Sequence, residues 1–105
     1  MKRDSVPLPA PLVWTFDGRL DHCLADVEDT LRRAIVLIGD VARVALLIEL
    51  SLPALRQRVA AGDAVQPAWG RFLARAAGYG FPVAPRVRHL TTRGPLITLV
   101  IAYRN

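Results

Sequence analysis

Residues 20–50 read LDHCLADVEDTLRRAIVLIGDVARVALLIEL, a helical repeat followed by an apolar run of strand length. From Leu20 to Ile38 apolar side chains recur every three or four positions, which predicts a helix with one buried stripe. Gly39 follows the last of them and suits the end of a helix. The run from Val44 to Leu50 is almost continuously aliphatic, which is typical of a strand covered on both faces. The stripe consists of Leu20, Leu24, Val27, Leu31, Ile35 and Ile38.

A first strand precedes this helix. Leu12, Trp14 and Phe16 alternate with Val13 and Thr15, the period of a strand, and Asp17-Gly18 closes it with a turn pair. We expect the strands near 12–17 and 44–50 to be parallel, either as neighbours or one strand apart. The helix between them should pack its stripe on the sheet.

The second half of the chain predicts two helices and two strands. A helix is expected over 53–60 after a Ser51 cap, and another from Pro67 to about 77. Its apolar face comprises Trp69, Phe72, Leu73 and Ala76. Prolines 82 and 85 make 87–90 an edge strand, whereas 96–103 is apolar enough for the inside of the sheet.

The predicted fold is therefore a single small α/β domain, on the boundary with α+β, in the order βαβααββ. Its mixed four-stranded sheet is covered by helices. We expect residues 1–10 to form a flexible N-terminal arm and residues 11–105 to form the globular domain. The chain start has no apolar run of signal-peptide type and no segment that suits a membrane span, so the expected location is the cytoplasm.

Charge is sorted by position. Residues 1–50 hold six basic groups against eight acidic ones, and residues 51–105 hold eight arginines against Asp63 alone, giving net charges of −2 and +7 and a total of +5. This asymmetry predicts an anionic partner for the second half. The partner would be nucleic acid, phosphate, an acidic protein or the acidic half of a second copy.

Four arginines are the candidate anion-binding or partner-binding residues. Arg71 and Arg75 lie four apart on a predicted helix, and Arg86 and Arg88 lie on one face of a predicted strand. A solvated face, or charges that protect an edge strand from pairing with other chains, explains the same residues without a ligand.

Catalytic candidates are few. Asp17 and Glu49 each fall at the carboxyl end of a predicted strand, where α/β proteins usually place ligands, so a small enzyme with an Asp17/Glu49 site is one alternative. His22 and Cys23 are helix neighbours whose side chains diverge, and no spacing of His and Cys suits a metal. We expect no cofactor, no metal and no catalytic residue.

Three segments resemble the STAS domains of anti-sigma-factor antagonists, which are regulatory binding modules. They are Gly18-Arg19-Leu20-Asp21-His22, Ile48-Glu49-Leu50-Ser51 and Arg86-Val87-Arg88-His89-Leu90. The family's Asp-Ser-Ser-Gly phosphorylation loop has no counterpart, because Ser51-Leu52-Pro53-Ala54 stands in its place, and no site is carried over. The resemblance implies a partner-binding role.

These observations favour a non-catalytic regulatory or partner-binding domain that acts through protein–protein association. Val36 and Leu37 lie off the main helical stripe and, with the opposite charges of the two halves, favour a homodimer with apolar contact at its centre. A nucleic-acid-binding protein that uses the arginine-rich second half is the main alternative.

Overall fold

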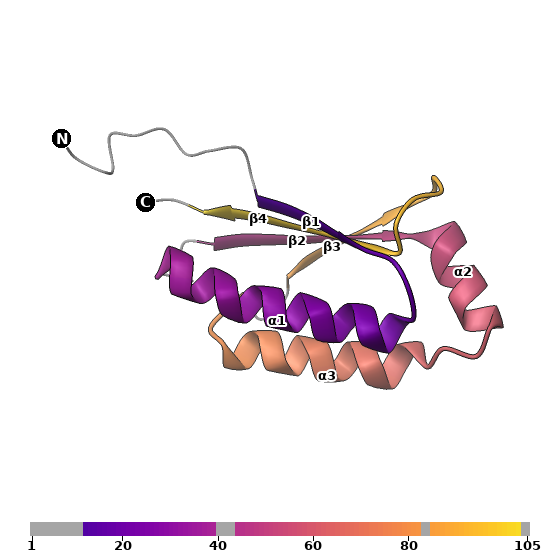
Figure 1. The fold of residues 1–105 in the computed structure, drawn as a ribbon, viewed down its shortest axis with the longest axis horizontal. Coiled ribbons are helices and arrows are strands. Elements are labelled where there is room, and N and C mark those ends of the chain that lie inside the picture. Colours follow the sequence, from indigo (N-terminus) through magenta and orange to yellow (C-terminus); the bar gives the residue numbers. More distant parts are fainter. Residues whose placement is uncertain (1–11, 40–43, 83–84, 104–105) are drawn as a thin grey trace.

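The computed structural model describes residues 12–39, 44–82 and 85–103 (Figure 1). The expected arm over 1–10 lies outside these residues. The order βαβααββ is as predicted, in one small domain. The elements are β1 (Leu12–Phe16), α1 (Leu20–Ile38), β2 (Val44–Ser51), α2 (Leu52–Ala60), α3 (Val65–Gly78), β3 (Arg86–Leu90) and β4 (Ile97–Tyr103).

The four strands form one mixed sheet in the order β1-β4-β2-β3. β4 is antiparallel to both β1 and β2, whereas β2 and β3 are parallel. The strands β1 and β2 are therefore parallel and one strand apart, which confirms the second of the two arrangements expected. β3 is an edge strand and β4 lies inside the sheet, as predicted.

Helices α1 and α3 lie side by side against one face of this sheet (Figure 1). The predicted stripe of α1 is the face that is buried: Leu24, Val27 and Leu31 are inaccessible, and Ile35 packs at the margin of the core. On α3, Phe72 and Ala76 are buried. The domain is thus two layers, one of helices and one of strands, with a single core between them.

Helices α2 and α3 begin where local chemistry allows it. The Ser51 hydroxyl caps α2 by accepting from the Ala54 amide at 3.3 Å, as predicted. Helix α3 begins at Val65, two residues before the predicted start, so that Pro67 falls within the first turn. Amides of the first turn have no partner inside the helix, so proline costs little anywhere in it.

The start of α1 is held from elsewhere in the chain. Its N-cap position is Arg19, whose side chain makes no capping hydrogen bond. Instead the Leu20 amide donates to Asp63 Oδ2 at 3.1 Å, across 43 residues of sequence. The Asp63 side chain is only 8% exposed, and its Oδ1 lies 3.5 Å from Arg19 Nε. The loop between α2 and α3 is thereby tied to the N-terminus of α1.

One expectation about β2 is wrong. Val44–Leu50 was expected to be covered on both faces, but α1 and α3 cover only the face that carries Val44, Leu46, Ile48 and Leu50. An aliphatic run indicates that both faces of a strand are largely apolar. It does not indicate whether helices of the same chain cover both faces. The second face of β2 is left without a helix in the described part of the chain.

Candidate partner-binding face

The sheet face opposite α1 and α3 is here named the open face. Burial alternates along the central strands, so that every second residue turns away from the core. Strand β3 follows the same rule over Arg86–Arg88, because Val87 packs against the core and its two arginine neighbours are exposed. The open face consists of Val13, Thr15, Ala45, Leu47, Glu49, Arg86, Arg88, Thr98, Val100 and Ala102.

Strand register arranges these side chains in rows that cross the sheet. One row runs Val13, Val100, Leu47, Arg86 from β1 to β3. Its first three members are aliphatic, and Val13 is 55% exposed. Directly opposed side chains on one sheet face lie about 4.5–5.5 Å apart at Cβ, so these three form one continuous apolar strip. In the adjacent row toward the start of β2, Ala45 and Ala102 are partners on the two central strands.

The next row is polar and runs Thr15, Thr98, Glu49, Arg88. Glu49 accepts a hydrogen bond from Arg88 Nη2 in a close ion pair. The Glu49 side chain is only 12% exposed although no described helix covers it, whereas that of Arg88 is 63% exposed. This ion pair lies at the β3 edge of the open face. The aliphatic strip beside it carries no charged side chain.

The four arginines predicted to form a site fall on two different layers. Arg71 and Arg75 are exposed on α3, in the helical layer. Arg86 and Arg88 share the open face, as their alternation on the strand predicted. The charge of Arg88 is matched by Glu49; among the residues described, no acidic group lies within 4.0 Å of the other three. The two predicted pairs therefore do not share a layer.

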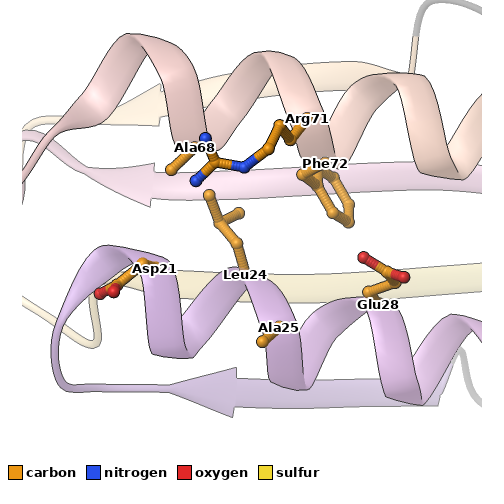
Figure 2. A pocket seen from close by; sticks show the side chains of 7 residues that line it. All are labelled: Asp21, Leu24, Ala25, Glu28, Ala68, Arg71 and Phe72. Carbon is orange, nitrogen blue, oxygen red and sulfur yellow. The ribbon is translucent and has the colours of Figure 1, made fainter.

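Arg71 overhangs a shallow groove between α1 and α3, with a cavity volume of about 230 Å³ (Figure 2). Its floor is apolar and includes Leu24 and Phe72, and its rim carries the carboxylates of Asp21 and Glu28. Glu28 already accepts a hydrogen bond from the Tyr79 hydroxyl at 3.1 Å. The Asp21 carboxylate lies 3.6 Å from Arg19 Nε. Both carboxylates thus have protein partners. The groove is lined by Asp21, Leu24, Ala25, Glu28, Ala68, Arg71 and Phe72.

The carboxylates proposed for an enzyme site have separate partners. Asp17 Oδ1 accepts from Arg58 Nη2 at 3.0 Å, and Glu49 is paired with Arg88. Each of these negative charges is balanced by its own guanidinium, an arrangement that suits ion pairing more than shared-proton chemistry.

The nucleophilic side chains are engaged in structure. Cys23 is 2% exposed in the core beside Gly18. Burial raises the pKa of its thiol, and the carboxylates of Asp17, Asp26 and Asp63 raise it further against the opposing effect of Arg58. A protonated, inaccessible thiol is a poor nucleophile.

The other residues weighed for chemistry are dispersed. Ser51 is buried and donates from its hydroxyl to the Thr92 carbonyl at 3.1 Å. His22 lies on α1 and His89 on β3, both exposed. Within residues 12–39, 44–82 and 85–103 no three His, Cys, Asp or Glu side chains gather as metal ligands. No helix in those ranges is long and apolar enough to cross a bilayer.

The sequence analysis did not single out Val13, Leu47 and Val100, which form the aliphatic strip of the open face. A signal for Leu47 was present in β2, where Ala45 and Leu47 are apolar although they alternate with the residues that face the helices. Comparison with known proteins adds no further signal, since no family model, no curated protein and no solved structure matches this chain.

Proposed function

We propose that this chain is a non-catalytic partner-binding domain whose binding surface is the open face, and that the partner is a second copy of the same chain. The observation that carries the proposal is the aliphatic strip Val13, Val100, Leu47 on a sheet face that no described helix covers. Apolar sheet faces are stable when another layer packs on them at a distance of about 10 Å.

The dimensions of the face suit a small interface. From the standard spacing and rise of strands, it spans roughly 19 Å across four strands and roughly 17 Å along five residues, which is a flat area of roughly 320 Å² per copy. The relief of the side chains enlarges the area that becomes inaccessible, yet the total stays at the low end for specific complexes, under about 1,200 Å². We therefore expect a reversible dimer with a Kd in the micromolar range.

The composition of the face favours a second copy over a charged partner. Its centre is aliphatic and its one acidic group is already paired with Arg88. Arg86 stands at the end of the aliphatic strip, so a polyanion would meet one unmatched charge there. Association through this face should therefore depend on apolar contact, and wild-type affinity should change little with salt.

A second exposed apolar site competes for this role. Val36 and Leu37 are 84% and 78% exposed near the C-terminus of α1, and the sequence pattern predicts a dimer contact through them. Among the residues described they form a single exposed apolar pair on α1 near Arg33, whereas the open face carries a strip across the sheet. The pair supplies a matched control for the test.

The test is the oligomeric state of Leu47→Arg and Val36→Arg, measured by sedimentation equilibrium beside the wild-type chain. Concentrations on the order of 1 to 100 µM bracket the expected Kd. Leu47→Arg places a charge at the centre of the open face and should leave only monomer. Val36→Arg adds the same charge elsewhere and should dimerise like the wild type. Circular dichroism confirms that each variant remains folded.

Three results would contradict the proposal. A monomeric wild type throughout the range would remove self-association, and loss of the dimer in Val36→Arg alone would move the interface to α1. Tight binding of DNA or RNA at low salt by the wild-type chain, with a steep fall as salt is raised, would favour the nucleic-acid alternative.

A further inference from the structure

We infer that the two copies are related by a two-fold axis that runs parallel to the strands, midway between β4 and β2. This inference rests on the proposed function, because it specifies how two open faces meet. The sheet order β1-β4-β2-β3 has two central and two edge strands, so an axis at its middle exchanges β4 with β2 and β1 with β3. Each strand of one copy then faces its exchanged counterpart in the other.

This axis brings each row of one open face opposite the same row of the second copy, read in reverse order. Val100 and Leu47 are neighbours on the two central strands, so each would face the other residue of the second copy. Ala45 and Ala102 would exchange in the same way. The aliphatic centre is thereby buried against itself in two equivalent contacts, as an isologous interface requires.

The edge strands of the two copies face one another as well. The strand that carries Arg86 and Arg88 would face β1 of the second copy, which presents Val13 and Thr15. The guanidinium groups of the two copies are then held at opposite edges of the interface, about three strand spacings or roughly 14 Å apart.

An axis that instead runs across the strands, along the row from Val13 to Arg86, is unfavourable. It would place β3 on β3, so that Arg86 of one copy met Arg86 of the other. Like charges that face one another at an interface disfavour association. The two arrangements differ in the residue of the second copy that faces Val13. It is Arg86 when the axis is parallel to the strands and Val13 when the axis runs across them.

The test is a pair of opposite charges at that residue, Val13→Glu and Val13→Arg, with the Kd of each measured by sedimentation equilibrium at low salt. With the inferred axis, glutamate would face Arg86 and arginine would repel it, twice per dimer. Each exposed charge contact is modest, so Val13→Glu should dimerise more tightly than Val13→Arg by roughly tenfold, and the gap should shrink in high salt. Adding Arg86→Glu to Val13→Arg should restore affinity.

Val59→Glu and Val59→Arg are the matched controls, because Val59 is also about half exposed but lies on α2, away from the open face. They report the effect of net charge alone and should differ little from each other. With the axis across the strands, both Val13 variants would set like charges together, so weakening in both relative to the controls would overturn the inference. Such a result leaves the proposed function intact, whereas a monomeric wild type removes both.

Discussion

Replacing Asp63 by alanine removes the group that caps α1 from a distance. Its carboxylate accepts the Leu20 amide at 3.1 Å, and the local N-cap residue, Arg19, offers no acceptor in its place. In the variant, an amide at the start of a 19-residue helix loses its partner at a position where the native side chain is only 8% exposed.

The expected cost can be assembled from three contributions. Loss of an N-cap acceptor costs about 1 kcal/mol. Loss of a negative charge beside the N-terminus of a helix costs about 0.3–1 kcal/mol. The contact with Arg19 adds little, because that side chain is 66% exposed and surface ion pairs contribute at most about 1 kcal/mol. Asp63→Ala should therefore lower the free energy of unfolding by about 1–2 kcal/mol.

Urea unfolding followed by circular dichroism measures this loss, and thermal unfolding should show a fall in Tm of about 4–8 °C per kcal/mol for a domain of this size. Asp63→Asn keeps an oxygen acceptor and should recover most of the loss. Asp21→Ala removes the other carboxylate beside Arg19 and a negative charge of the first turn of α1, but no capping bond, and should cost about 0.3–1 kcal/mol. Equal losses in Asp63→Ala and Asp21→Ala would show that negative charge beside Arg19 and the helix N-terminus, and not the cap, is what Asp63 contributes.

Two further predictions concern other buried groups. Ser51→Ala removes the α2 cap and the donor to the Thr92 carbonyl, and should cost about 1–2 kcal/mol in urea unfolding, with Ser51→Thr as the conservative control. The buried Cys23 thiol should react with iodoacetamide far more slowly than the thiol of the unfolded chain. The pKa of the Cys23 thiol is raised in the folded state, so the folded chain favours the neutral thiol. This contribution to the free energy of unfolding is present below the ordinary thiol pKa of about 8.5 and is lost as pH rises above it. The free energy of unfolding should therefore fall less at alkaline pH in Cys23→Ala than in the wild type, and an identical fall in both would contradict the prediction.

Much of the fold could be predicted because its determinants are local. The stripe of α1, the glycine that ends it and the alternation in β1 each depend on residues a few positions apart, and all are found as expected. The choice between neighbouring and separated β1 and β2 stayed open in the sequence. It depends on β4 pairing with both, a contact between residues up to 89 apart, such as Leu12 and Ile101.

The candidate site was less predictable for the same reason. The sequence shows correctly that Arg86 and Arg88 share one side of β3, because alternation on a strand is local. It cannot show that Arg86 and Arg88 point away from the helix that carries Arg71 and Arg75, since this depends on which sheet face the helices cover. The cap of α1 is equally hidden, because the local N-cap signal is absent at Arg19 and the acceptor lies 43 residues away.

The charge asymmetry between the two halves is partly satisfied within the chain itself. Asp17 pairs with Arg58 and Glu49 pairs with Arg88, so acidic groups of the first half meet arginines of the second. The reverse contact joins Arg19 to Asp63, the single acid of the second half. The asymmetry therefore reflects, in part, contacts that hold the halves together. Fewer charged groups would need an outside partner than the sequence count indicates. Among the described residues of the candidate set, it is the charge of Arg71, Arg75 and Arg86, divided between the helical layer and the edge of the open face.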